Sequence, residues 1–239
     1  MSQANINVIV LDVTGDALDL IYAACRQCYS EKFAGEFMRG SADGGKKSQF
    51  IRKIVASGHD SPLEHAKFTF AVEGVSRALT HQLVRHRIAS YSQQSQRYVR
   101  EESFDYIIPP VIEKKPELKK EFIAVMGAIQ QSYNRLREAI RSSGASAEKA
   151  NEDARFVLPQ AAETKIVVTM NCRELLHFFQ LRCCSRAQWE IKALADRMLE
   201  LCREKLPEVF HGAGAKCRKL GYCPEGEKFT CGRYPLHKE

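Results

Sequence analysis

The residues best suited to chemistry lie in one stretch, Arg85 to Tyr98, which reads RHRIASYSQQSQRY. Within fourteen positions it holds four cations or potential cations and three serine hydroxyls. Arginine presents a planar fork of N–H donors that matches phosphate, and serine adds short directional donors. Arg85 and Arg87 lie two positions apart, so they point to different sides of a helix or strand. The stretch therefore predicts a site that binds two phosphorylated molecules next to each other.

Polar residues also gather in two further blocks, His59 to His65 and Arg155 with 171–186. Taken singly, such a histidine is more often structural, and such an arginine is more often a solvated charge. The clustering around Arg85 favours phosphate binding, because a purely structural role would leave many donors unpaired. The chain has no Gly-x-Ser-x-Gly, Walker loop or Pro-Cys-His motif, and no Gly-x-Gly-x-x-Gly follows a strand. Many anion-binding side chains without an evident nucleophile indicate chemistry supplied by a cofactor, held outside a Rossmann site.

The composition indicates one globular domain over residues 1–239, long enough to bury a large core. No charged leader and no apolar stretch of about 20 residues is present, so we expect neither export nor a membrane span. A cytoplasmic protein is the resulting expectation. The net charge of +7 favours anionic partners such as nucleotides, nucleic acid or polyglutamyl cofactors.

Nine cysteines, an odd number, argue against a complete disulfide framework and favour reduced thiols. Residues 207–239 form a loop-rich tail with Cys217, Cys223 and Cys231, and with His211 and His237 nearby. A zinc site needs four ligands, usually including a pair two to four residues apart, and these spacings do not fit. We therefore predict no metal site and an ordered tail with free thiols, although the sequence leaves metal binding by the three cysteines open.

The hydrophobic patterns predict strands at 5–13, 67–73, 104–108 and 164–171, and helices at 16–29, 47–56, 76–87, 118–140, 146–156, 173–182 and 186–205. Loops are expected at 35–45, which is rich in glycine, and after Arg87. Because the elements do not alternate regularly as βαβ, the fold class is α+β, with a mostly antiparallel central sheet flanked by long helices. The apolar stripe of the longest helix is read as core packing, with a subunit contact as the alternative.

A helix start is predicted at Ser61. Ser61 and Glu64 have the spacing of a capping box, and Pro62 falls at the first helical position. The amides of such a helix start favour an anion, although a plain structural cap is at least as common.

The pattern that begins with Arg85-His86-Arg87 and ends at Arg97 resembles the signature of the flavin-dependent thymidylate synthases, which methylate deoxyuridylate (dUMP) with reduced FAD. The resemblance extends from about Cys25 to Leu206. It rests on four blocks in order: 58–65, the arginine stretch, 155–159 and 171–190.

This resemblance implies a set of site residues. FAD would be held by His59, Ser61, Glu64, Arg85, His86, Arg87, Gln93, Asn171, Arg173 and His177. dUMP would be held by Gln82, Arg85, Gln93, Gln94, Ser95, Gln96, Arg97, Arg155 and Arg182. In the family these groups come from different subunits of a homotetramer, so the resemblance implies active sites at subunit interfaces.

The implied reaction has NADPH reduce FAD, while 5,10-methylenetetrahydrofolate supplies one carbon to C5 of the uracil. Hydride from the flavin then gives thymidylate (dTMP) and tetrahydrofolate. Arg182 would be the catalytic residue, stabilising negative charge at N3 and O4. Family members often carry Asn and Glu where this chain has Ser92 and Gln93, and some carry His at Arg186, which leaves the roles of these positions open.

Two other functions compete with this one. A basic nucleic-acid-binding protein could stack bases on Tyr91 and Tyr98 between arginines. The even spread of the acidic residues and the concentration of arginines beside helix ends weigh against it. A flavoprotein that transfers hydride without methylating is the other alternative. We therefore expect small-molecule substrates, and neither nucleic acid nor membrane as a partner.

Overall fold

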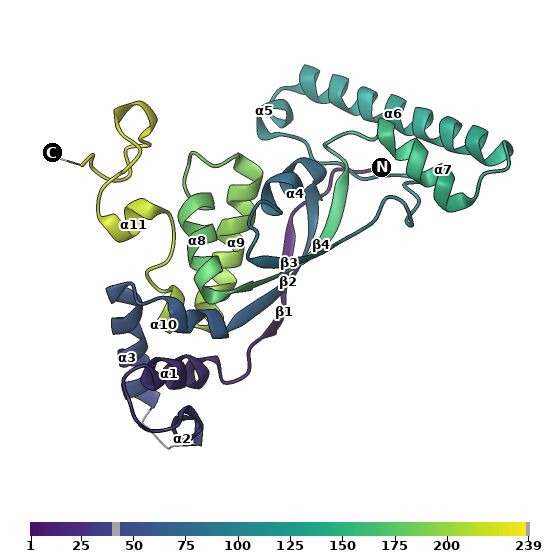
Figure 1. Ribbon diagram of the computed structural model, residues 1–239. Helices are drawn as coiled ribbons and strands as arrows, with labels where there is room; N and C mark the ends of the chain where they lie inside the picture. The colour runs from purple at the N-terminus through teal and green to yellow at the C-terminus, as the bar shows by residue number, and fades with distance from the viewer. Residues whose placement is uncertain (40–43, 238–239) are drawn as a thin grey trace. The chain divides into compact units, whose positions relative to one another are not determined.

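The computed structural model describes residues 1–39 and 44–237 and contains a four-stranded sheet (Figure 1). The strands are β1 (Asn7–Val13), β2 (Lys67–Ser76), β3 (Ala89–Gln93) and β4 (Glu163–Asn171), in the order β1-β2-β4-β3. The start of β2 pairs with the end of β4, since Cys172 N donates to Ala66 O, and Arg77 N donates to Ala162 O at the other end. β2 and β4 are therefore antiparallel, and the predicted α+β class with antiparallel pairing is confirmed.

The helices are α1 (Ala17–Gln27), α2 (Ala34–Arg39), α3 (Gly44–Ser57), α4 (Arg77–Leu83), α5 (Pro110–Glu113), α6 (Pro116–Ser142), α7 (Ala147–Ala154), α8 (Cys172–Arg182), α9 (Trp189–Lys205), α10 (Pro207–Phe210) and α11 (Lys216–Leu220), with 3₁₀ turns η1 (Ser61–His65), η2 (Arg155–Val157) and η3 (Glu227–Phe229). Polar side chains cap several of them. Ser76 caps α4, Ser146 caps α7 and Gln188 caps α9, each by accepting a backbone N–H of the first turn. Among the described residues, no helix is both long and apolar enough to cross a membrane.

The chain divides into two compact units, and the prediction of one domain over 1–239 stays a prediction. The first unit comprises Met1–Asn7, Val72–Arg85 and Tyr91–Val167. The second unit comprises the described parts of Val8–Ala71, His86–Ser90 and Val168–Glu239.

The core of the first unit lies under α6. Phe104, Tyr106 and Met126 are buried there, with Phe122 and Ile129 packed against them. The predicted apolar stripe of this helix is only partly core, because Leu118, Val125 and Leu136 are 40–46% exposed. α6 packs through a narrow face centred on Met126, Gln130 and Tyr133, so apolar residues beside that face remain at the surface.

Gly74 in β2 allows the N-terminal segment of the first unit to pack closely against this strand. Its φ is +67°, and a Cβ there would meet Asn5 O at 1.8 Å. Its N–H donates to Glu163 Oε1 at 2.8 Å. Only glycine combines this conformation with so close an approach of the backbone.

The core of the second unit is aromatic. Phe68 and Phe70 on β2 stack with ring centroids 5.8 Å apart, and Phe210 of α10 contacts both Phe68 and Phe179 edge-on. Helices α8 and α9 pack side by side over this region (Figure 1). Buried aromatic rings at this spacing stabilise the fold by more than the burial of their apolar area alone. These contacts therefore hold α8 firmly in the core of the second unit.

Several predicted boundaries are wrong around the arginine stretch. The helix predicted over 76–87 ends at Leu83, which leaves Arg85 to Arg87 outside it, and residues 89–93 form strand β3 in place of a loop. Tyr91 anchors this strand by donating its hydroxyl to Leu83 O at 2.9 Å. The strand was missed because Ser90, Ser92 and Gln93 hide the apolar alternation that marks most strands.

Two further predictions need correction. In the segment 104–108, Tyr106 forms isolated bridges to Gln3 and Ala162 and the segment is not a strand. The glycine-rich segment 35–45 contains α2 and the start of α3. The remainder of that predicted loop, 40–43, lies outside the described residues.

Candidate functional site

In the second unit, His86 forms hydrogen bonds with two polar residues of α8, Glu174 and Arg182. It is 6% exposed, and its Nδ1 lies 3.2 Å from Glu174 Oε1. Arg182 Nε donates to His86 Nε2 at 3.1 Å. Because Nε2 accepts this bond, the ring proton is assigned to Nδ1, which donates to Glu174.

This arrangement keeps His86 neutral. Burial, followed by the charges of Arg182 and His177, lowers the pKa of His86 from 6.5 to about 4. Burial raises the pKa of the Glu174 carboxyl. The His86–Glu174 contact is therefore a hydrogen bond from a neutral ring at pH 7, although its distance would also fit an ion pair.

Arg182 is thereby oriented at the last residue of α8. Its Nε is committed to His86, and in the part of the chain that the structure describes its terminal nitrogens carry no hydrogen bond. A guanidinium held by one nitrogen with two others available suits an anionic ligand or a developing negative charge. The structure therefore places the predicted catalytic residue in a fixed orientation.

The η1 turn packs against α8 and carries two of the predicted flavin residues, Ser61 and Glu64, and a third, His59, lies two residues before it. Glu64 forms an ion pair with Arg173 of α8, and His59 Nδ1 lies 3.4 Å from the Tyr29 hydroxyl. The predicted capping box at Ser61 is wrong. The 3₁₀ turn already includes Ser61, and Glu64 reaches the cation on α8 instead of its own backbone.

Three other predicted flavin residues of the second unit lie on or near these elements. Asn171 is the N-cap of α8, and its Oδ1 accepts from Glu174 N at 2.8 Å. His177 is exposed on α8, with its ring centroid 6.3 Å from that of His86. Arg87 is exposed. η1 and α8 thus gather His59, Ser61, Glu64, His86, Asn171, Arg173, His177 and Arg182 in one unit.

In the first unit, predicted nucleotide residues follow β3. The Gln93 amide nitrogen donates to Thr80 Oγ1 and Thr164 Oγ1 at 3.1 and 3.2 Å. Gln94 Oε1 is buried and has no hydrogen-bond partner among the described residues. A buried acceptor without a donor costs about 1–3 kcal/mol, so this oxygen is placed to accept from a ligand.

Arg77 is a residue of this region that the sequence did not single out. Its Nη1 donates to Gln94 O at 3.3 Å. Burial lowers the pKa of Arg77, Glu101 raises it, and the neighbouring charge of Arg155 lowers it. Arg155 and Gln94 are thus brought together around Arg77. Its position in the first turn of α4 carried no signal of a site, because an arginine there usually faces solvent.

Arg97 is held by two carboxylates of α7. Its Nη2 lies 2.8 Å from Glu148, its Nε lies 3.1 Å from Glu152, and its side chain is half exposed. Exposed pairs of this kind contribute about 0–1 kcal/mol each, so they can be exchanged for a ligand at small cost. Ser95 Oγ accepts from Arg97 N, and Gln96 is buried against Glu101. Gln82 is half-buried on α4 and Arg85 is exposed beyond it.

Over its described residues, the tail of the second unit carries the short helices α10 and α11 and the turn η3. Arg186 anchors it, by an ion pair with Glu225 and by lying over the Phe229 ring at 4.3 Å from the centroid. His237 stacks edge-on with Tyr222. Over residues 1–39 and 44–237, no three His, Cys, Asp or Glu side chains are already set to ligate a metal.

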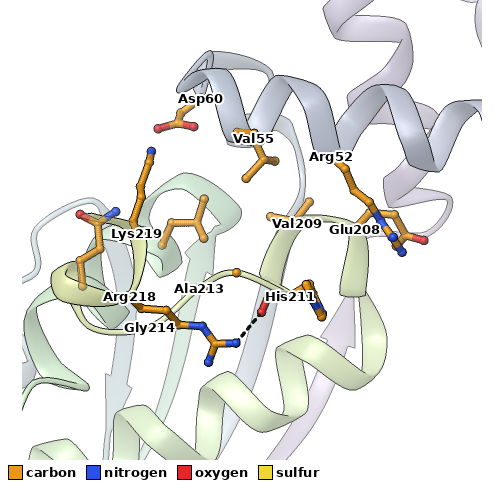
Figure 2. Close-up of a pocket in the computed structure, with 14 residues that line it drawn as sticks. Arg52, Val55, Asp60, Glu208, Val209, His211, Ala213, Gly214, Arg218 and Lys219 are labelled. Carbon is orange, nitrogen blue, oxygen red and sulfur yellow. Dashed lines mark hydrogen bonds between the residues drawn. The ribbon is translucent and has the colours of Figure 1, made fainter. Parts of the chain in front are cut away.

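A cavity of about 420 Å³ lies in the second unit between α3, α8, α10 and α11 (Figure 2). Apolar Val55, Leu176, Val209 and Ala213 line it, together with several charged side chains. Of these, Arg218 donates to His211 O at 3.2 Å. None of the predicted site residues lines it, although Asp60 does and is their neighbour in sequence. Its residues are scattered over several elements, so no sequence motif marks it; they are Arg52, Val55, Ala56, Asp60, Leu176, Gln180, Glu208, Val209, His211, Gly212, Ala213, Gly214, Arg218 and Lys219.

The fold is similar to that of a solved structure, described as a UMP/dUMP methylase PolB from Streptomyces cacaoi bound with 5-Br dUMP. The TM-score is 0.72 over 88% of this chain and 95% of that one. The sequences are 23% identical, so this likeness supports the fold alone.

Closer relatives cover nearly the whole chain. A flavin-dependent thymidylate synthase of Nitratidesulfovibrio vulgaris is 56% identical, over 100% of this chain and 99% of its own length. Enzymes with the same name from Clostridium tetani and Geobacter sulfurreducens are 44% and 48% identical, each over 95% of this chain and 94% of its own length. Residues 9–208 match the sequence profile of a family described as "Thymidylate synthase complementing protein". The chain therefore belongs to the thymidylate synthase complementing protein family, Thy1, as its resemblance to the flavin-dependent thymidylate synthases implies.

Proposed function

We propose that this protein is an FAD-dependent thymidylate synthase, which converts dUMP to dTMP. The observation that carries the proposal is Arg182, whose guanidinium is oriented by a neutral, buried His86 while its terminal nitrogens remain available. The 56% identity with a relative of that name over the full chain supports it.

The residues of η1 and α8 suit FAD. Arg87 and Arg173 are exposed and supply cations for a diphosphate, and the half-buried His59 and the exposed His177 add aromatic rings. Arg85 and Gln93 of the first unit complete the proposed set. When bound and reduced by NADPH, FAD supplies the hydride that completes the methyl group.

The residues around Arg77 suit a pyrimidine nucleotide. Arg155 and Arg97 offer guanidinium groups for the phosphate of dUMP. The unpaired Gln94 Oε1 can accept from a ribose hydroxyl or from N3–H of the base. Together with Arg182 of the second unit, the proposed nucleotide residues are Gln82, Arg85, Gln93, Gln94, Ser95, Gln96, Arg97 and Arg155.

The proposed reaction consumes dUMP, 5,10-methylenetetrahydrofolate, NADPH and a proton. It produces dTMP, tetrahydrofolate and NADP⁺, so atoms and electrons balance. The methylene carbon forms a bond to C5, and the C5 proton leaves. While that bond forms, negative charge grows on N3 and O4 of the uracil, where Arg182 would stabilise it. One such preorganised donor contributes about 3–4 kcal/mol to transition-state stabilisation.

A homotetramer with active sites between subunits is part of the proposal. Phe156 is 84% exposed and Ile88 is 69% exposed, and each is next in sequence to proposed site residues. Large apolar side chains exposed beside a site are typical of surfaces that a partner subunit covers.

Tritium release from C5-labelled dUMP tests the reaction directly. We expect release that depends on both NADPH and methylenetetrahydrofolate, with thymidylate formed in equal amount, from protein that carries bound flavin. Oxidation of NADPH without tritium release would favour the alternative of a flavoprotein that transfers hydride without methylating. Purified, folded protein that binds neither flavin nor dUMP would reject both functions.

A further inference from the structure

Four cysteines of the second unit are among the residues that line a small cavity, which the proposed reaction does not use. Cys184, Cys217, Cys223 and Cys231 all line this cavity, whose volume is about 20 Å³. A cavity needs roughly 10–15 Å³ to hold one water molecule, so this space fits a single small ligand such as one ion.

The four thiols come from segments that other contacts hold together. Cys184 lies in the turn after α8, Cys217 lies on α11, and Cys223 and Cys231 lie in the tail. Arg186, two residues after Cys184, binds both Glu225 and the Phe229 ring between the last two cysteines. Cys223 N also donates to Pro235 O at 2.6 Å. The segments that carry the four cysteines are therefore held together by contacts that need no metal.

The surroundings of the cluster differ from those of the core cysteines. Cys172 and Cys202 are fully buried in the packed interior, as inert structural thiols usually are. In contrast, Cys184 and Cys217 are half-buried and Cys231 is exposed, so an ion could enter. Lys216 lines the cavity and Arg233 lies near Cys231, which places positive charge where four thiolates would concentrate negative charge.

We propose that Cys184, Cys217, Cys223 and Cys231 bind one Zn²⁺ as four thiolates. Zn²⁺ favours tetrahedral sulfur ligands, with Zn–S distances of about 2.3 Å, and four protein ligands indicate a structural site. Binding releases the thiol protons, and no electron is transferred. Among the described residues no three such side chains are positioned to hold a metal, so binding would require the thiols to turn toward the cavity.

The prediction of no metal in the tail considered residues of the tail alone, and the proposed site adds Cys184 to them. The missing ligand is Cys184, which lies 33 positions before Cys217 in the sequence and is brought to the tail by the fold. The match to the family profile ends at residue 208, so three of the four ligands lie beyond it.

Zinc binding would also fix α11. Cys217 on this helix contacts the thiol cluster, while Arg218 and Lys219 on the same helix line the 420 Å³ cavity. A metal that holds Cys217 would therefore hold these two cations in place. The expected role is structural and separate from the proposed reaction.

Metal analysis of the full-length, reduced protein tests the site. We expect about one zinc per chain after purification and removal of loosely bound metal. Replacing it with Co²⁺ should give the visible bands of tetrahedral cobalt and a thiolate-to-cobalt charge-transfer band. Wild-type protein that takes up neither ion, or cobalt spectra without sulfur ligation, would overturn the proposal.

Single Cys→Ser variants at the four positions identify the ligands. Each should weaken zinc binding by at least about 10-fold, while Cys28→Ser, an exposed cysteine elsewhere in the second unit, should bind as the wild type does. If a variant fails to fold, the wild-type cobalt spectrum still decides the question. An equal loss of zinc affinity in Cys28→Ser would count against the site. Because thymidylate synthesis is assayed separately, failure here leaves the proposed function standing.

Discussion

The two units hold their proposed site residues in different ways. In the second unit, Arg182 is bound to His86, which is buried and bound in turn to Glu174. In the first unit, Arg97 is held by half-exposed carboxylates, and within the described parts of the chain the buried Gln94 Oε1 has no hydrogen-bond partner. The Arg182 side chain is therefore fixed before any ligand binds. The residues of the first unit have only part of their hydrogen-bonding capacity filled.

This difference matches the tasks proposed for the two groups. A cation that stabilises a transition state acts best when its orientation is fixed beforehand, because no reorganisation is needed during the reaction. A nucleotide must bind and leave, so weak surface pairs and an open acceptor suit the residues that hold it. Substitutions should therefore affect turnover in the second unit and nucleotide affinity in the first.

The largest effect is expected from Arg182→Ala. Turnover should fall by about 10²–10³-fold, because a preorganised donor is lost, while FAD stays bound. Steady-state tritium release and flavin absorbance measure the two properties. Arg197→Ala, which removes an exposed arginine of α9 in the same unit, should change neither. Loss of flavin in Arg182→Ala would show that Arg182 holds the cofactor and would remove its catalytic role.

Arg155→Ala and Arg87→Ala should separate the two ligands. Loss of a charge-assisted hydrogen bond costs about 1.5–3 kcal/mol, so the first variant should weaken dUMP binding by about 10- to 100-fold and leave FAD nearly unchanged. The second should weaken FAD more than dUMP. Titration of each ligand into both variants gives the comparison, with each variant as the control for the other. The reverse pattern would contradict the division between the units.

Much of the fold could be predicted because local signals agreed with tertiary contacts. The spacing of apolar residues around Phe122 and Ile129 predicts the buried face of a helix. The alternation of Phe68 and Phe70 predicts the buried face of a strand. The His86–Arg182 bond joins residues 96 positions apart, so residue types alone could name both partners but not their orientation. Arg77 was missed for the same reason, since its contacts with Gln94 and Arg155 arise only from neighbours that folding supplies.

An effect of intermediate size concerns acid stability. The pKa of His86 falls from 6.5 to about 4 on folding, so as the pH drops below 6.5 the unfolded chain takes up the proton first. The folded state then loses stability down to about pH 4, and by pH 5 the loss is about 2 kcal/mol. Denaturant unfolding of wild type and His86→Asn at pH 7 and pH 5 measures this, with the variant losing less stability on acidification.

Other charged groups near His86 also affect how the stability of the two proteins changes with pH. Arg182 and His177 face His86, and the raised pKa of Glu174 acts in the opposite direction, because its burial penalty is relieved as the pH falls. Both proteins keep these three groups, so the difference between them reports mainly His86. Equal losses of stability in wild type and variant would mean that His86 is not held neutral by its surroundings.

The smallest effect should come from the carboxylates that hold Arg97. In a Glu148→Gln, Glu152→Gln double variant, Arg97 is released and two negative charges near the proposed phosphate site are removed. Because exposed pairs are worth at most about 1 kcal/mol, dUMP should bind about 2- to 5-fold more tightly, and the gain should shrink as salt is raised. A Glu117→Gln, Glu138→Gln variant removes the same charge from exposed positions of α6 and should leave the affinity unchanged. Weaker dUMP binding in the first variant would show that α7 positions Arg97 for the phosphate, and the first unit would then be as preorganised as the second.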